Sequence, residues 1–295
     1  MRFGIDVGGT TVKIGVVDNY EIKDTFVIKT TKDTLFKDIC ESIKEYIKKH
    51  NITNVELLGF GLPGNVQNNY IVNLPNIGIK DVNLVDEVRK YITEYPIAST
   101  NDANAAALGE ALFGTKVKAS YFITLGTGVG GGYVYDNKVI DGIHCACGEV
   151  GHMYIDHIHE YQCSCGLKGC FETVASATGV VRLAKEYYNK FNTKLSLDGL
   201  TCKDVFDAAK ENDELGLYIL ELVSKYLARG LANIACTTDV DVFYIGGGVA
   251  ACGDILINKV KEYYKQYAFY ACKNTDIQLA KLGNSAGMLG AAYII

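Results

Sequence analysis

The chain has 295 residues, a length that predicts two domains, each large enough to bury a hydrophobic core. Its formal net charge of -5 argues against a nucleic-acid partner, because nucleic-acid surfaces of proteins are normally basic. No segment reaches the roughly 20 apolar residues that span a bilayer, so no membrane partner is expected. An apolar strand pattern starts by Phe3, so we expect no secretory signal and a cytoplasmic protein. The ten cysteines are then expected to be reduced thiols or metal ligands.

Strand and helix patterns alternate through the N-terminal part, which is typical of an α/β fold. The expected strands lie at residues 3–7, 13–17, 21–28, 55–61 and 97–99. The expected helices lie at residues 33–49, 83–95 and 102–113. A turn at Leu62-Pro63-Gly64 ends the fourth strand.

The pattern then restarts. Residues 5–19 align without a gap with residues 123–137, and five of the aligned pairs are identical. Two glycine-rich hairpins could match this well by chance. The alternative is two related halves, each opening with strand, glycine turn and strand. On that interpretation we expect domains at 1–117 and 118–295, with a terminal helix that packs back on the first domain.

The second half continues with the same alternation. Helices are expected at residues 177–191, 201–210, 213–236, 254–267 and from about 284. Strands are expected at 242–245 and 277–280.

One imidazole and three thiolates gather in a glycine-rich stretch, on His152, Cys163, Cys165 and Cys170. They are the ligand set of a closed tetrahedral zinc site. The stretch has little core of its own, so a metal would fix its shape. Glu149 and Glu172 flank the ligands and would be held by the same clamp. Fixed carboxylates beside a metal indicate a ligand-binding pocket rather than a metal site that only stabilises the fold.

Other potential metal ligands lie close by. His157 and His159 also precede the cysteines, although we favour His152 as the ligand. Cys145 and Cys147 could compete for the metal, but small buried cysteines in place of alanine are the preferred interpretation.

Two glycine turns each join a pair of strands, Asp6-Val-Gly8-Gly9-Thr10-Thr11 and the turn at residues 125–132. Glycines let backbone N–H groups approach a phosphate, and hydroxyls add donors. Asp6 could face the magnesium ion of a nucleotide. Neither turn is a P-loop or a dinucleotide fingerprint. A single turn of this kind is usually structural, whereas two at equivalent places favour phosphate binding.

Two further segments have a structural and a functional interpretation. Gly246-Gly247-Gly248 suits the flat face of an adenine, or simply connects a strand to a helix. Asn101-Asp102 precedes an alanine run, so it is expected to cap a helix. Alternatively, Asp102 is a general base for a substrate hydroxyl and Asn101 binds a neighbouring hydroxyl.

Taken together and in order, these motifs resemble the ROK family of sugar kinases and repressors. The resemblance is carried by Asp6-Val-Gly-Gly-Thr, Gly61-Leu-Pro-Gly64, Pro75-Asn76, Asn101-Asp102-Ala-Asn-Ala-Ala, Leu125-Gly-Thr-Gly-Val-Gly-Gly-Gly, Gly148-Glu-Val-Gly-His152 and Cys163-x-Cys165-Gly-x-x-Gly-Cys170-x-Glu172. It covers essentially the whole chain. It implies the actin-like ATPase (ribonuclease H-like) fold, with sugar and ATP meeting in a cleft between two related domains.

The resemblance also assigns roles to residues. Asp102 resembles the catalytic base of ATP-dependent phosphoryl transfer to a hexose. The residues that resemble sugar contacts are Gly64, Asn76, Asn101, Asp102, Glu149, His152 and Glu172. The candidates for binding ATP and Mg²⁺ are Asp6, Gly8, Gly9, Thr10, Thr11, Lys13, Thr127, Gly128, Gly247 and Gly248. Zn²⁺ on His152 and the three cysteines would have a structural role. Members of the family commonly form dimers, so the resemblance also implies a homodimer.

Glucose is the expected substrate, with glucose 6-phosphate as product. Fructose, mannose, allose and N-acetylated hexosamines stay open, because specificity rests on single hydroxyl contacts. The family often has Trp after Pro-Asn, but this chain has no Trp, so its sugar-side wall differs. Polyphosphate is an alternative donor. A repressor of the family would carry an additional N-terminal helix-turn-helix, whereas the first strand here is expected to start at Phe3, so a repressor is disfavoured. A non-catalytic sugar sensor is the remaining alternative.

Overall fold

A computed structural model describes residues 1–115 and 117–294. Contacts divide the chain into two compact units. The first unit comprises residues 1–116, 132–148 and 281–295, and the second comprises residues 117–131 and 149–280. These discontinuous units differ from the continuous domains 1–117 and 118–295, because residues 132–148 and the C-terminal segment are grouped with the N-terminal part. That residues 1–117 and 118–295 form two separate domains stays a prediction.

The first unit is built on a five-stranded sheet with the order β3-β2-β1-β4-β8. Its strands are β1 (Arg2–Val7), β2 (Thr11–Asp18), β3 (Glu21–Lys29), β4 (Leu57–Leu62) and β8 (Ile97–Asn101). β1 to β3 are antiparallel, whereas β4 and β8 run parallel to β1. Every residue of β4 is buried, as expected for a central parallel strand.

The helices of the first unit follow the predicted pattern with one exception. They are α1 (Leu35–His50), which follows the 3₁₀ turn Lys32–Thr34, α2 (Leu84–Arg89) and α3 (Asp102–Phe113). α1 buries Leu35, Ile39 and Ile43 on one face and ends at Asn51, whose φ of 51° places it in the left-handed region. α2 is shorter than the predicted helix at 83–95: it ends at Arg89 and is followed by turns in which the Tyr91 and Ile92 N–H groups donate to the Val88 carbonyl.

A small antiparallel sheet, β5-β6-β7, was not predicted. Its strands are β5 (Asn65–Gln67), β6 (Tyr70–Leu74) and β7 (Ile79–Asn83). Asn68 and Asn69 both have positive φ and form the tight turn between β5 and β6. Two consecutive asparagines are a turn signal that could have predicted this turn, because Asn tolerates positive φ.

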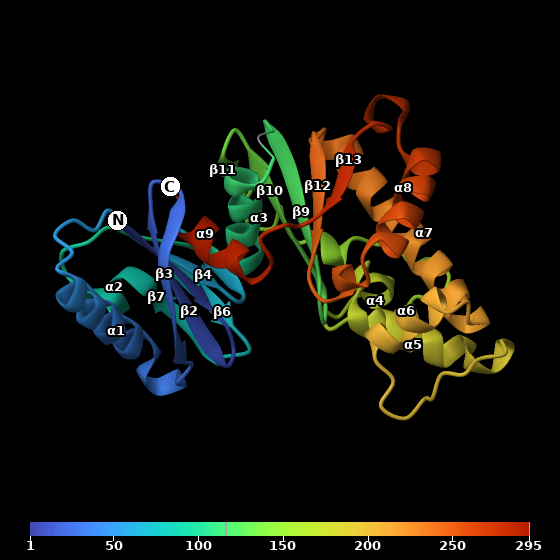
Figure 1. Cartoon of the computed structure of the whole chain (residues 1–295), viewed down its shortest axis with the longest axis horizontal. Coiled ribbons are helices and arrows are strands. Elements are labelled where there is room, and N and C mark those ends of the chain that lie inside the picture. The colour runs from blue at the N-terminus through green and yellow to red at the C-terminus, as the bar shows by residue number, and fades with distance from the viewer. Residues whose placement is uncertain (116, 295) are drawn as a thin grey trace. The chain divides into compact units, whose positions relative to one another are not determined.

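The C-terminal helix α9 (Ala286–Ala291) packs into the first unit with all six residues buried. Figure 1 shows it, in red, beside the blue N-terminal strands. Gly4 of β1 and Gly59 of β4 face it so closely that a methyl group at either position would collide with a backbone carbonyl of α9. The predicted terminal helix is thus confirmed, after a 3₁₀ turn at Gly283–Ser285.

The second unit holds the parallel strands β9 (Ala119–Leu125), β12 (Val242–Gly246) and β13 (Asp276–Leu279). Their sheet has the order β11-β10-β9-β12-β13, and the boundary between the units falls inside β10 (Val129–Tyr135), before the short β11 (Lys138–Val139). The predicted restart of strand, glycine turn and strand at residues 123–137 is confirmed in β9 and β10.

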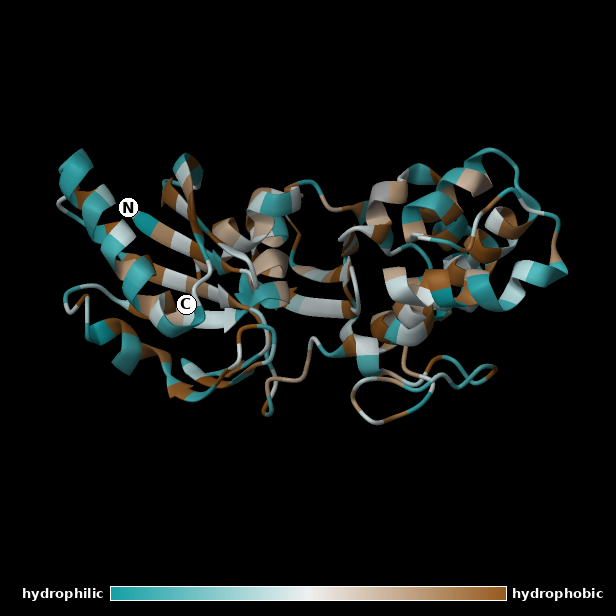
Figure 2. Ribbon diagram, turned by 90° about the horizontal axis from the view of Figure 1, so that it is seen from below, coloured by the Kyte–Doolittle hydropathy of each residue, from teal (hydrophilic) through white to brown (hydrophobic). Residues whose placement is uncertain are grey.

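The helices of the second unit pack mainly on one another. They are α4 (Glu172–Ala175), α5 (Ala177–Tyr187), α6 (Cys202–Lys210), α7 (Glu214–Thr238) and α8 (Asp254–Tyr267), with 3₁₀ turns at Val150–His152, Tyr188–Lys190, Val249–Cys252 and Tyr270–Cys272. α4, α5, α6 and α8 pack against α7. Figure 2 shows hydrophobic residues gathered where these helices face one another and hydrophilic residues on outer turns and loops. Within residues 1–115 and 117–294, no helix has the length and apolar character needed to cross a membrane.

Candidate functional site

The first glycine turn joins β1 to β2 in the first unit. The Gly8 N–H donates to the Thr11 carbonyl at 2.9 Å and closes the turn, while Thr30 Oγ1 donates to the Gly8 carbonyl at 2.7 Å. Residues 9–11 are exposed, so their N–H groups and hydroxyls face outward from a fixed backbone. A methyl group at Gly9 would lie 3.8 Å from Cβ of Asn76, which places that predicted sugar contact beside the turn.

Asp6 stands at the entrance to this turn. It lies opposite Lys13 in the β1–β2 ladder. Burial raises the pKa of its carboxyl, and the nearby Lys13 ammonium acts in the opposite direction. A methyl group at Gly287 of α9 would lie 3.0 Å from Cγ of Asp6. The carboxyl is therefore held between the sheet and the C-terminal helix, where it could meet a hydrated cation.

Asn101 and Asp102 lie where β8 ends and α3 begins. Asn101 Oδ1 accepts a hydrogen bond from the Asn104 N–H at 2.7 Å, so the capping interpretation is confirmed. Asp102 is exposed, and its Oδ1 accepts from the Ala103 N–H at 2.8 Å. The helix start therefore orients the carboxylate that is the predicted base.

The remaining predicted residue of the first unit is Gly64, just after β4. Its φ of 145° is unfavourable for other residues, and a methyl group there would collide with the Asn73 carbonyl. The carboxyl ends of the parallel strands β1, β4 and β8 thus carry Asp6, Gly64 and Asn101 along one edge of the sheet. Ligands of open parallel sheets bind at such an edge.

The second glycine turn joins β9 to β10 in the second unit. The Gly126 N–H donates to the Gly128 carbonyl at 3.0 Å, and Thr178 Oγ1 donates to the Thr127 carbonyl at 2.9 Å. A methyl group at Gly128 would lie 2.5 Å from Oε2 of Glu172. The predicted phosphate turn and a predicted sugar contact are therefore neighbours in this unit.

The third glycine segment, at Gly247, lies against the second glycine turn. Its φ is 84°, and a methyl group there would lie 2.5 Å from the Leu125 carbonyl. A methyl group at Gly248 would meet no atom of the described residues within 4 Å, which leaves open space beside the turn. The candidate adenine contact thus adjoins the candidate phosphate turn.

The four predicted zinc ligands come together. The ligand atoms of His152, Cys163, Cys165 and Cys170 all lie within 4.8 Å of one another. Cys163 Sγ is 3.7 Å from His152 Nδ1, and Cys165 Sγ is 3.6 Å from Cys170 Sγ. Zinc–ligand bonds of about 2.3 Å to sulfur and 2.0–2.1 Å to nitrogen, in tetrahedral geometry, put ligand atoms at about these separations. We call residues 152–170 the zinc loop.

Both flanking carboxylates lie at this cluster. Glu172 Oε1 accepts from Cys163 Sγ at 3.0 Å, and Glu149 Oε2 is 3.8 Å from His152 Nε2. Both carboxylates thus lie beside the predicted ligands, and the metal-held clamp itself stays a prediction. His157 and His159 are outside the four-residue cluster, and Cys145 and Cys147 belong to no metal-compatible group among residues 1–115 and 117–294.

One group of interacting residues was not predicted from the sequence. Asp156 and His159 of the zinc loop form a buried hydrogen-bonded cluster with Tyr226 of α7. Tyr226 lies 70 residues from Asp156, and no spacing in the sequence signals that the two meet.

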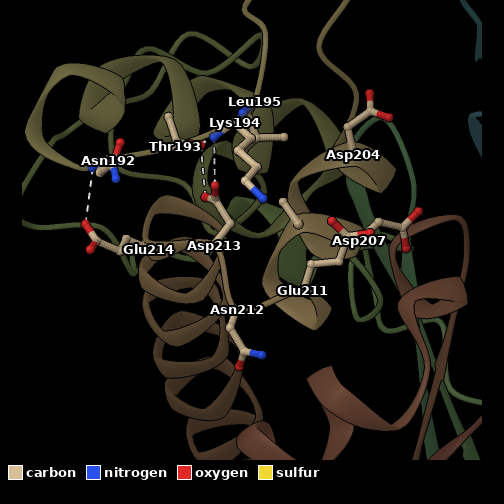
Figure 3. Close-up of a pocket in the computed structure, with 11 residues that line it drawn as sticks. Asn192, Thr193, Lys194, Leu195, Asp204, Asp207, Glu211, Asn212, Asp213 and Glu214 are labelled. Atoms are coloured by element: carbon tan, nitrogen blue, oxygen red, sulfur yellow. Dashed lines mark hydrogen bonds between the residues drawn. The ribbon is translucent and has the colours of Figure 1, made fainter.

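Two cavities are lined by none of the predicted site residues. One, of about 720 Å³, is lined in the first unit by residues that include Asn68, Ser99 and Asp141. The other, of about 460 Å³, lies in the second unit between residues 192–195, α6 and the start of α7 (Figure 3). One of its carboxylates has a local role: Asp213 accepts from Thr193 Oγ1 and the Lys194 N–H, and caps α7.

The folded units, with glycine turns beside parallel strands, define an α/β protein of the actin-like ATPase class. The model of the ROK family matches residues 2–295, and the chain belongs to this family. It is 36% identical over 310 aligned positions to a glucokinase of Halalkalibacterium halodurans, covering 99% of this chain and 94% of that one. An N-acetylmannosamine kinase of Haemophilus influenzae is 28% identical, covering 98% and 93%.

A solved structure is similar over the same length. The ROK family glucokinase from Streptomyces griseus, in complex with glucose and AMPPNP, has a TM-score of 0.77 and 30% identity, covering 99% of this chain and 97% of that one.

Proposed function

We propose that the chain is an ATP-dependent glucokinase that transfers the γ-phosphoryl group of ATP to glucose and forms glucose 6-phosphate. The observation that carries the proposal is the chain-long similarity to glucokinases at 36% identity. The exposed Asp102 carboxylate and both glycine turns, which phosphoryl transfer requires, are present.

In this mechanism Asp102 accepts the proton of the attacking sugar hydroxyl, and Asn101, already fixed as the cap of α3, contacts a neighbouring hydroxyl. Glu149, His152 and Glu172 hold further hydroxyls, with Gly64 and Asn76 beside the sugar. Positioning and charge neutralisation provide most of the acceleration of phosphoryl transfer.

The phosphates of ATP lie against the backbone N–H groups of the two glycine turns in this proposal. Thr10, Thr11 and Thr127 add hydroxyl donors, and Lys13 adds a positive charge near Asp6. Bound Mg²⁺ neutralises phosphate charge, and Asp6 would hold its hydration shell. Gly247 and Gly248 leave room for the adenine.

Zinc is assigned a structural role on His152, Cys163, Cys165 and Cys170. The donor set and the separations of its atoms fit a closed tetrahedral site. Zn²⁺ would fix the loop and thereby Glu149 and Glu172. A cytoplasmic homodimer is part of the proposal, since symmetric dimers are the commonest assemblies.

The second candidate function is a kinase of another hexose or of N-acetylmannosamine, favoured by the relative of Haemophilus influenzae. The test is a coupled assay of ADP release with Mg²⁺ and ATP across glucose, fructose, mannose, allose, N-acetylglucosamine and N-acetylmannosamine. The proposal predicts the highest kcat/KM with glucose. A higher value for another sugar would reassign the substrate, and no turnover with any would indicate a sugar sensor. Replacing ATP by polyphosphate identifies the donor.

A further inference from the structure

Within the zinc loop, several donors converge on one buried carboxylate oxygen. Oδ1 of Asp156, a side chain with no solvent exposure, accepts from the Tyr226 hydroxyl at 2.9 Å and from the Ile158 and His159 N–H groups at 3.2 and 3.0 Å. His159 Nδ1 is 3.1 Å from the same oxygen. The His159 side chain is itself only 5% exposed.

These bonds favour the ionised state of the carboxyl. Burial acts to raise the pKa of Asp156, but the hydrogen bonds from the His159 backbone, the Tyr226 hydroxyl and the His159 ring together hold it below its usual value. A buried carboxylate is retained only where donors compensate for its lost hydration, so this cluster requires a defined geometry.

The cluster joins the zinc loop to two helices. Tyr226 belongs to α7, and Tyr187 of α5 lies 3.1 Å from His159 Nε2 through its hydroxyl. The Asp156 N–H also donates to the Gly169 carbonyl at 3.0 Å, directly before the ligand Cys170. Movement of the cluster would therefore move the loop.

A second connection runs from His159 to Glu172. The His159 ring stacks on Tyr161, with centroids 5.0 Å apart and planes 8° apart. The Arg182 guanidinium lies over the Tyr161 ring, 5.0 Å from its centroid, and donates to the Thr173 carbonyl at 2.7 Å. Thr173 follows Glu172 directly and also donates through Oγ1 to the Cys170 carbonyl. The line of contacts ends at a predicted sugar ligand.

We propose that Asp156 and His159 are positioning residues, which set the geometry of the zinc loop and of Glu172 for sugar binding. The inference rests on the proposed function, because Glu172 is a proposed sugar contact. Residues of this kind, which orient the groups that touch metal or substrate, typically change affinity or activity about 10- to 100-fold when altered.

The test compares two tyrosine variants of the full-length protein. Tyr226→Phe removes the donor to Asp156 and keeps the ring. Tyr263→Phe, the control, removes a bond to the Glu221 carboxylate on another side of α7. Tyr226→Phe should raise KM for glucose about 10-fold, with kcat changed far less, and should accelerate amide exchange in residues 153–173. Tyr263→Phe should change neither.

Equal behaviour of the two variants in both measurements would overturn the inference. If the wild type does not phosphorylate glucose, the proposed function fails, whereas the exchange comparison still decides the positioning role. If Tyr226→Phe does not fold, Tyr187→Phe replaces it and should give the same changes to a smaller extent. Unchanged exchange in that variant would also contradict the inference.

Discussion

Burial of the Asp6 carboxyl is expected to lower the stability of the folded protein at neutral pH. Because burial raises its pKa, the folded state binds a proton more readily than the unfolded state, so the free energy of unfolding falls as pH rises from the unfolded-state pKa to the folded-state pKa. At neutral pH the ionised carboxylate therefore destabilises the first unit. It is retained, in our account, to face the magnesium ion of the nucleotide.

Asp6→Asn should accordingly raise Tm, and the gain should be larger at pH 8 than at pH 4, where the native carboxyl is closer to neutral. The same variant should lose turnover by about 10²-fold or more, since a preorganised charge near the transferring phosphoryl group is removed. Thermal unfolding at both pH values and the ADP-release assay measure the two effects. A Tm gain of equal size at both pH values would contradict the pKa shift.

At the scale of elements, the proposed zinc ion would stabilise a loop that has little hydrophobic core of its own. Cys165→Ala should remove bound zinc and activity together, because the loop is expected to hold Glu149 and Glu172 in place only when zinc is bound. The thiol of Cys165 is exposed, so little packing is lost with it. Cys236→Ala, at another exposed thiol, should retain about one zinc per chain and full activity. Zinc analysis and kinetics check both, and an active zinc-free Cys165→Ala protein would disprove the clamp.

The packing of α9 is a second property at this scale. Its backbone lies against Gly4 and Gly59 without intervening side chains. Gly59→Ala should lower the free energy of unfolding by about 1–3 kcal/mol or more, because the added methyl group overpacks the contact. Gly126→Ala is the control, because its methyl group would meet no atom of the described residues within 4 Å. Denaturant unfolding measures the difference, and a stability loss no larger than that of Gly126→Ala would contradict the close packing.

At the scale of the whole molecule, the first unit depends on the last residues of the chain. A chain ending at Leu282 lacks α9, and it should expose β1, β4 and α3, which α9 covers. Limited proteolysis should then cleave within residues 1–115 first. All four proposed zinc ligands belong to the second unit, so bound zinc should be retained. Protection of the first unit equal to that of the intact chain would contradict this dependence.

Local signals explain how much of the fold was predictable. α3 and α8 begin and end at the predicted residues, because Asn101 caps the former and apolar spacing defines the latter. β5 to β7 were missed because short, polar strands show little apolar alternation. The cluster of His152 with the three cysteines was predictable from the spacing of potential metal ligands. The Asp156–Tyr226 contact was not, because it depends on how α7 packs against the loop.

The central claim is that this chain phosphorylates glucose with Asp102 as the base. The most direct test measures kcat for glucose and the Kd of glucose for the wild type and Asp102→Asn. Asn keeps the side-chain oxygen that accepts from Ala103, so the helix start should persist. We predict a fall in kcat of about 10²–10⁴, with glucose binding retained. Turnover by Asp102→Asn at the wild-type rate, or no turnover by the wild type itself, would contradict the account.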